Sequence, residues 1–159
     1  MLVGCVPPSS EGPARVEVGL PAPAYRAASL SGDSVSLSDY KDKVVLLNVW
    51  ATWCHPCRTE IPELKAIRAR YQSRGLELIG VSVDADGNDD GIREFMKEFQ
   101  MEYPVWHDPA ERVSTQFLVI GVPATFLIDR KGILRWRKTG PVAPNDTSLV
   151  NAIERALDS

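Results

Sequence analysis

The sequence contains few cysteines and histidines and no long apolar run. Three cysteines and two histidines occur among its 159 residues. A structural zinc site takes about four such ligands, and the two histidines, His55 and His107, lie far apart in the sequence. No apolar stretch approaches the roughly 20 residues that a helix needs to cross a bilayer. We therefore expect neither a metal site nor a membrane-spanning helix.

Charge is nearly balanced, and no basic cluster stands out. Lys and Arg number 18 against 21 Asp and Glu, which gives a net charge of -3. Without a basic stripe interleaved with aromatic residues, we expect no nucleic acid among the partners. The composition, with 44% hydrophobic and 25% charged residues, is typical of a globular protein. The length suffices for one domain with a sizeable core.

The N-terminal segment differs in composition from the rest of the chain. It lacks apolar periodicity and is rich in Pro, Gly, Ser and Ala. This composition predicts a flexible tether over residues 1–22, followed by one domain over residues 23–159. Within the tether, Leu2-Val3-Gly4-Cys5 resembles the lipobox of bacterial lipoproteins, in which the cysteine is lipidated. Cys5 is therefore a candidate lipid anchor, and the alternative is a free thiol in a terminal tail.

The other two cysteines stand at positions 54 and 57, directly after the apolar run Val44–Trp50. The run predicts a buried strand, and the apolar positions that follow predict a helix over about 54–73. A sulfur at a helix N-terminus meets the positive end of the helix dipole and unpaired N–H groups, which favour the thiolate. Cys54 is thus the expected nucleophile, and Cys57, one turn along, is the expected resolving thiol. The spacing predicts thiol–disulfide exchange.

Periodicity predicts the remaining elements as an alternation of strands and helices. We expect strands at 25–30, 34–37, 43–50, 76–83, 104–106, 124–128 and 133–138. We expect further helices at 92–99, 110–117 and 146–157. Such an alternation implies an α/β fold with a central mixed sheet, parallel at its centre and covered by helices on both faces. The segment 104–106 is expected to be an edge strand.

Two segments resemble a known family. Residues 48–62 (NVWATWCHPCRTEIP) resemble the active-site segment of the TlpA/ResA-like branch of the thioredoxin superfamily. Residues 121–129 (GVPATFLID) resemble its second signature. The two occur in the family's order, separated by a βα insertion typical of this branch. The resemblance covers the chain from about Pro21 onward and implies a thioredoxin-like fold with an N-terminal β-hairpin.

The resemblance points to Glu60 as an acid/base group. It falls one turn after Cys57, where ResA-like proteins carry a carboxylate that acts on the cysteine protons. In other thioredoxins the buried acid lies on the preceding strand, and here that position is Asn48, which cannot titrate. The alternative is a surface residue paired with Arg58 or Lys65.

The neighbours of the two cysteines have expected roles as well. A protonated His55 would stabilise the adjacent thiolate and tune the couple, and the alternative is a solvated side chain. Pro56 fits the first helical turn because its missing N–H costs little there. The resemblance implies a cis Val122–Pro123 bond, with Val122 offering its backbone to an extended substrate segment. Trp53 is expected to flank the exposed sulfur, completing the substrate-binding residues.

Two polar features are expected at the surface. His107 is a poor candidate for a copper ligand, because redox copper proteins of this kind use CxxxC and the spacing here is CxxC. It is therefore expected in a surface loop. Residues 84–90 lack the spacing of a calcium loop and are expected to form a solvated acidic loop.

Together these observations predict an extracytoplasmic, periplasmic thiol–disulfide oxidoreductase, foremost a reductant. Its cofactor would be the Cys54–Cys57 disulfide alone. The resemblance implies oxidised protein thiols as substrates, such as apocytochrome c, and a membrane thiol-electron transporter as donor. The alternatives are an oxidase or isomerase, a docking module that uses the Val122–Pro123 edge, and a peroxiredoxin-like peroxidase. The peroxidase would need Thr or Ser where Ala51 stands.

Overall fold

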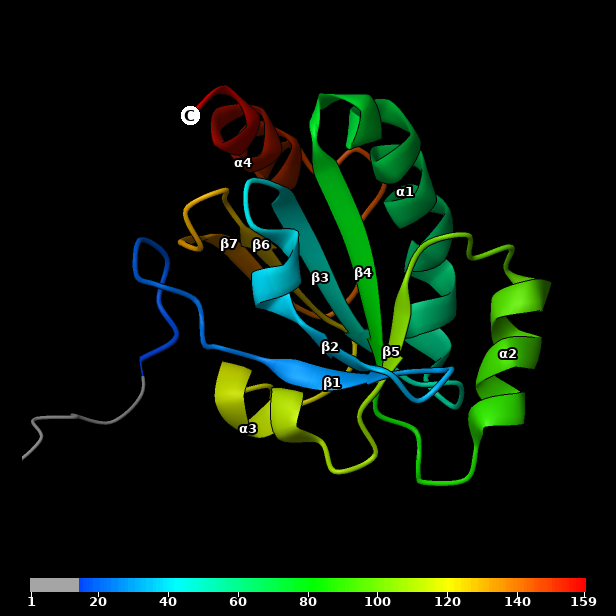
Figure 1. Ribbon diagram of the computed structural model, residues 1–159. Coiled ribbons are helices and arrows are strands. Elements are labelled where there is room, and N and C mark those ends of the chain that lie inside the picture. The colour runs from blue at the N-terminus through cyan, green and yellow to red at the C-terminus, as the bar shows by residue number, and fades with distance from the viewer. Residues whose placement is uncertain (1–14) are drawn as a thin grey trace, which may run out of the picture.

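A seven-stranded mixed sheet forms the centre of the protein (Figure 1). The structure is a computed structural model and describes residues 15–159, so the predicted lipobox at Leu2–Cys5 lies outside the described residues. The strands run in the order β2-β1-β5-β4-β3-β6-β7. They are β1 (Arg26–Ser29), β2 (Ser34–Ser36), β3 (Val44–Trp50), β4 (Leu76–Ser82), β5 (Val105–His107), β6 (Ala124–Ile128) and β7 (Leu134–Thr139).

Four α-helices pack around this sheet. They are α1 (His55–Tyr71), α2 (Asp89–Glu98), α3 (Arg112–Phe117) and α4 (Thr147–Asp158). Short 3-10 turns lie at η1 (Leu37–Tyr40) and η2 (Gln72–Arg74). All predicted strands and helices are confirmed, and Asp146 is the N-cap of α4. Among the described residues, no helix is long and apolar enough to cross a membrane.

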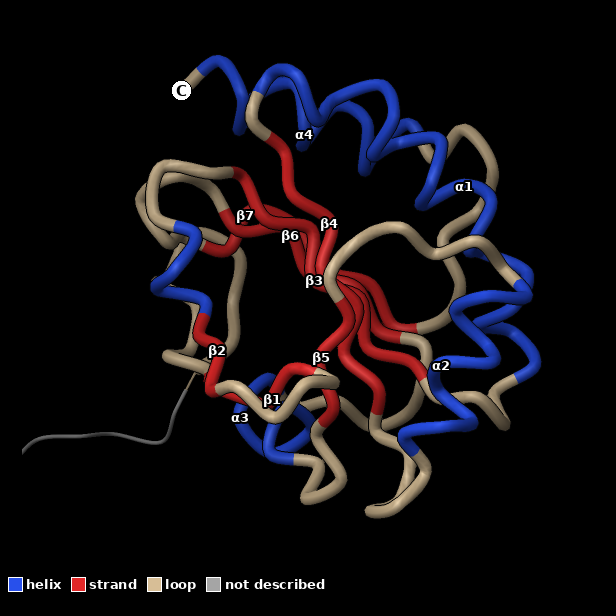
Figure 2. Tube along the Cα trace, turned by 45° about the vertical axis from the view of Figure 1, so that its right-hand side comes forward, coloured by secondary structure: helices blue, strands red, loops and turns tan. Residues whose placement is uncertain are grey.

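The side chains of β3 alternate between the two faces of the sheet, and helices cover both faces. All seven residues of β3 are buried. Trp50 stacks on Phe95 of α2, with ring centroids 4.7 Å apart, on the face that α1 also covers. On the opposite face, Phe126 of β6 meets Phe117 of α3 at 4.8 Å. Figure 2 shows α1, α2 and α4 together on one side and α3 apart from them. The predicted fold class is therefore confirmed.

The predicted edge position of the 104–106 strand is wrong. β5 lies inside the sheet, parallel to β4 on one side and antiparallel to β1 on the other. The N-terminal hairpin supplies this second partner, with Ala28 opposite His107. Parallel pairing is consequently limited to β3–β4–β5, and the true edges are β2 and β7.

The last part of the predicted tether is also wrong, because it belongs to the domain. Val16 is buried, and its carbonyl accepts a hydrogen bond from the Arg137 guanidinium at 2.6 Å. The Gly19 N–H donates to the Leu134 carbonyl at 2.8 Å. This segment therefore runs along the start of β7. Composition indicated a linker because it does not register backbone pairing of this kind.

Candidate active site

The two motif cysteines form a disulfide where β3 gives way to α1. Cys54 is the N-cap of α1, and its sulfur bonds to that of Cys57, with the Cα atoms 5.3 Å apart. The Cys57 N–H donates to Cys54 Sγ at 3.2 Å. Such a contact, at the positive end of the helix dipole, favours a thiolate on Cys54 in the reduced protein. Cys54 is 4% exposed and Cys57 1%, so Cys54 is the more accessible by a small margin.

The neighbours of the disulfide in the sequence lie at the surface. His55 and Pro56 are exposed, and Pro56 occupies the first turn of α1. Trp53 is 70% exposed, which is unusual for so large an apolar side chain. These three residues therefore expose their side chains to solvent directly beside Cys54 in the sequence.

Glu60 is buried, and the expected alternative of a surface ion pair is wrong. It is 1% exposed. Its Oε1 accepts from the Asn48 side-chain amide at 2.7 Å, and its Oε2 accepts from the Val142 N–H at 2.8 Å. The side chains proposed as its partners point elsewhere: Arg58 donates to the Thr52 carbonyl and Lys65 to the Phe99 carbonyl.

The surroundings of Glu60 give it an unusual acidity. Burial raises its pKa from 4.5 to about 7, although the hydrogen bonds from Val142 and Asn48 and the charge of Lys138 act in the opposite direction. A carboxyl group with a pKa near neutrality can both take up and release a proton under physiological conditions. Glu60 lies one helical turn beyond Cys57, so this capacity is placed beside the buried cysteine.

The Val122–Pro123 bond is cis, as expected. β6 begins at Ala124, which lies opposite Val49 in the antiparallel pairing of β3 and β6. Continuing that register by one residue places Pro123 at the end of β3 from which the active-site turn departs. The segment that contains Val122 is therefore at the same end of the sheet as Cys54.

The segment before Val122 carries exposed apolar residues that the sequence analysis did not single out. Ile120 is 91% exposed and Leu118 is 50% exposed. The periodicity of the neighbouring helix does not extend to them, so the apolar residues at positions 118 and 120 gave only a weak signal in the sequence. With Trp53 they give this end of the molecule an apolar character.

Two residues predicted at the surface are instead buried near the active-site turn. Asp84 is 1% exposed and His107 is 7% exposed. Both are polar, and both are satisfied by hydrogen bonds within the protein, which allows their burial. The solvated loop therefore begins after Asp84.

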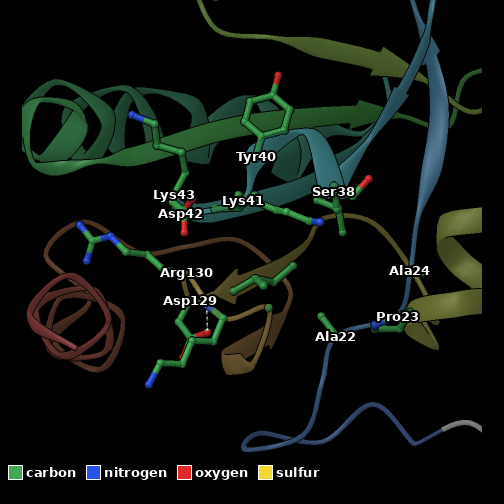
Figure 3. Close-up of a pocket in the computed structure, with 15 residues that line it drawn as sticks. Ala22, Pro23, Ala24, Ser38, Tyr40, Lys41, Asp42, Lys43, Asp129 and Arg130 are labelled. Carbon is green, nitrogen blue, oxygen red and sulfur yellow. Dashed lines mark hydrogen bonds between the residues drawn. The ribbon is translucent and has the colours of Figure 1, made fainter.

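A cavity of about 370 Å³ lies at the other end of the sheet (Figure 3). One wall is formed by η1 and the start of β3, including Lys41 and Lys43. The facing wall is formed by residues 129–132 and by Ala22 with its neighbours. Among the described residues, no predicted site residue lines it, so the cavity is separate from the disulfide.

Comparisons with known proteins agree with this geometry. The AhpC/TSA family matches residues 18–137. The thiol-disulfide oxidoreductase ResA of Bacillus thuringiensis is 36% identical over 118 residues, which cover 74% of this chain and 67% of the relative. ResA of Geobacillus kaustophilus is 34% identical over 144 residues, covering 91% and 78% respectively.

Solved structures give the same result. A candidate thiol:disulfide interchange protein DsbE from Chlorobium tepidum superposes with a TM-score of 0.81 at 31% identity, covering 90% of this chain and 99% of that one. The thioredoxin domain of a thiol-disulfide oxidoreductase from Bacteroides vulgatus gives 0.75 at 27% identity, covering 89% and 98%. The chain therefore belongs to the AhpC/TSA family of thioredoxin-like proteins and is a thiol-disulfide oxidoreductase of the ResA type.

Proposed function

We propose that this protein reduces disulfides of extracytoplasmic proteins, including the cysteine pair of apocytochrome c. The observation that carries the proposal is Glu60, a buried carboxyl group with a pKa of about 7 one turn behind the Cys54–Cys57 disulfide. A group of this kind can accept the proton of a buried thiol, and return it, at neutral pH.

The reaction begins with the reduced protein. The Cys54 thiolate attacks one sulfur of the substrate disulfide, which forms a mixed disulfide and releases the first substrate thiolate. Glu60 then takes the proton of the Cys57 thiol, and the Cys57 thiolate attacks Cys54 Sγ. The second substrate thiolate leaves. The two substrate thiolates then take up one proton each, one returned by Glu60 and one from solvent, which replaces the proton that Cys54 lost when it ionised. The substrate has gained two electrons and two protons, and the protein is left with the Cys54–Cys57 disulfide.

A reducing partner must restore the dithiol. The donor that we propose is a membrane thiol-electron transporter, because compartments outside the cytoplasm are oxidising and reducing equivalents must reach them across a membrane. Cys5 would hold the domain near that membrane, as its lipobox-like context suggests. Two acyl chains or an additional signal give stable anchoring where one chain does not.

Substrate binding would use the surface around the disulfide. Val122 would offer backbone N–H and C=O groups to an extended substrate segment, next to the cis Pro123. Trp53 and Ile120, both strongly exposed, would contact apolar side chains that flank the substrate cysteine. His55 would tune the stability of the Cys54 thiolate from the solvent side.

Peroxidase activity, which the fold also permits, has less support. A peroxidatic cysteine needs a hydroxyl group three residues before it to hold the peroxide, and the residue there is Ala51, which is fully buried. A methyl group cannot donate a hydrogen bond to a peroxide oxygen. An oxidase or isomerase would use the same residues, and the potential of the couple distinguishes them from a reductant.

Trapping of substrates tests the proposal. The Cys57→Ser variant cannot resolve the mixed disulfide, so it accumulates substrates bound to Cys54. In cells that make c-type cytochromes, we expect apocytochrome c among the trapped proteins and none with the Cys54→Ser/Cys57→Ser control. A trapped set that never includes a cytochrome precursor contradicts the maturation role.

A further inference from the structure

The turn that leads into Cys54 is tied to a buried carboxylate that lies just after another strand. Asp84 follows β4 and is 1% exposed. Its Oδ2 accepts from the Thr52 N–H at 2.9 Å, and its Oδ1 accepts from the Thr52 hydroxyl at 2.5 Å. Thr52 precedes Cys54 by two residues. One side chain therefore holds both the backbone and the hydroxyl of a residue in the active-site turn.

Other donors keep Asp84 itself in place. Its carboxylate also accepts from the Ser82 hydroxyl at 2.6 Å and from the Asn88 side-chain amide at 3.1 Å. Four donors face it, which matches an ionised carboxylate. Burial alone would raise the pKa of Asp84, but the hydrogen bonds from Ser82, Thr52 and Asn88 hold it below its ordinary value.

The backbone of Asp84 is fixed from a neighbouring strand. His107 of β5 places Nε2 2.9 Å from the Asp84 carbonyl oxygen, and its Nδ1 lies 2.8 Å from Oδ1 of Asp89 at the start of α2. A carbonyl oxygen can only accept, so Nε2 carries the proton in that contact. The buried imidazole thus joins β5, the segment after β4 and α2 behind the active-site turn.

Among the described residues, the active-site turn makes only a few other hydrogen bonds near Thr52. Its next residue, Trp53, is 70% exposed and contributes little packing. The Thr52 carbonyl accepts from Arg58 of α1 at 3.1 Å, and the Cys54 N–H donates to the Ala51 carbonyl at 3.1 Å. Thr52 thus has two partners among these hydrogen bonds. Arg58 comes from α1, whereas Asp84 comes from the segment after β4 and accepts from both the N–H and the hydroxyl of Thr52.

We propose that Asp84 is a positioning residue for the reaction, and that it sets the location of Cys54 Sγ by holding Thr52. The proposal rests on the proposed role of Cys54 as the attacking thiol. Displacement at a disulfide requires the attacking sulfur to approach along the S–S axis, and a misplacement of about 1 Å can cost roughly a hundredfold in rate. Among these hydrogen bonds, those to Asp84 alone tie Thr52 to the segment after β4, so the turn is a sensitive point for that alignment.

The chain offers a matched control. Asp129 is 3% exposed and, like Asp84, accepts several hydrogen bonds: from the N–H groups of Lys131 and Ile133 and from the Arg135 guanidinium. It follows β6 at the end of the sheet away from Cys54. Replacing either aspartate with asparagine removes one buried charge from a comparable network, but only Asp84→Asn disturbs the active-site turn.

The test measures the second-order rate constant with which the reduced full chain reacts with oxidised glutathione. We expect Asp84→Asn to lower this rate constant by about tenfold or more, and Asp129→Asn to leave it within about twofold. Unfolding midpoints of the two variants establish that they lose similar stability. Equal effects of the two substitutions on the rate constant overturn the proposal.

Thr52 provides a second route that does not require Asp84→Asn to fold. Thr52→Val removes the hydroxyl donor and should lower the rate constant by several-fold, whereas Thr52→Ser retains the donor and should react like the wild type. In Asp84→Asn/Thr52→Val the losses should not add, because both changes break the same contact. Fully additive losses, or a Thr52→Val variant as fast as Thr52→Ser, contradict the proposal.

One further measurement separates this inference from the assignment of the nucleophile. Iodoacetamide should alkylate the reduced wild-type protein first at Cys54. Alkylation first at Cys57 would overturn the proposed role of Cys54, and the role of Asp84 with it. Alkylation at Cys54 combined with equal effects of the two Asp→Asn substitutions would overturn the role of Asp84 alone.

Discussion

Asn48 and Glu60 join the central strand to the active-site helix through a hydrogen bond of 2.7 Å between two buried side chains. The amide of Asn48 and the N–H of Val142 both favour the charged carboxylate, whereas burial favours the neutral acid. These opposing effects bring the pKa of Glu60 to about 7. The strand therefore contributes to the chemistry even though Asn48 itself cannot titrate.

Replacing Glu60 should slow the resolving step and remove its pH dependence. As the base for Cys57, Glu60 must be ionised, so the wild-type rate should rise with pH through about 7. Glu60→Gln should lower the rate by roughly a hundredfold and flatten this rise. Stopped-flow resolution of a preformed mixed disulfide over a range of pH provides the measurement. An unchanged profile in the variant would exclude Glu60 as the base.

Replacing Asn48 should move the same profile to higher pH. Its amide stabilises the charged form of Glu60, so its loss raises the pKa of Glu60 above about 7. Asn48→Leu should therefore shift the midpoint of the rate profile upward. Thr125→Val is the matched control, because Thr125 accepts from the same amide at 3.0 Å and does not bond to Glu60. A downward shift in Asn48→Leu would contradict the account.

Glu60 should also make folding stability depend on pH. Its pKa is about 7 in the folded protein and 4.5 when the carboxyl group is freely solvated, as in the unfolded chain, so the folded state binds more protons between these values. The stabilising contribution is fully present below pH 4.5 and is lost as the pH rises through about 7. Stability should fall by up to about 3 kcal/mol over this range. Urea unfolding of the oxidised protein at about pH 5 and about pH 8 should show this loss in the wild type and much less in Glu60→Gln.

Replacing His55 should make the couple more reducing. The side chain is exposed next to Cys54, and in the proposed role it stabilises the Cys54 thiolate and so favours the reduced form. His55→Ala should therefore lower the potential by roughly 30 mV. Equilibration with a glutathione buffer at neutral pH measures the difference. An unchanged or higher potential in the variant would contradict the tuning role.

Ile120 should matter for protein substrates and not for small ones. It is 91% exposed, so Ile120→Glu should fold normally while it removes an apolar contact with the substrate. We expect the catalytic efficiency with insulin to fall about tenfold, the loss that corresponds to burial of part of an isoleucine side chain. The rate with oxidised glutathione should not change. Val18→Glu, which alters another exposed apolar residue, serves as control, and equal losses in both variants would exclude Ile120 from the binding surface.

Local sequence patterns were enough to predict the strand and helix that hold the two cysteines. The apolar run of β3 and the cysteine spacing predicted the strand, the helix and the disulfide, since each depends on neighbours in the sequence. The interior position of β5 depends on pairing with Ala28, far away in the chain, which periodicity does not report. The burial of Asp84 and His107 depends on hydrogen bonds between segments that are far apart in the sequence. The Val142 N–H that bonds to Glu60 likewise comes from a distant loop.

The reduction potential of the Cys54–Cys57 pair tests the central claim most directly. It is obtained from the fraction of oxidised protein at equilibrium with a thiol buffer at neutral pH. A reductant should have a value near that of thioredoxin, roughly -270 mV. A value near roughly -120 mV would instead describe a protein that donates disulfides, and would contradict the proposed direction of electron flow.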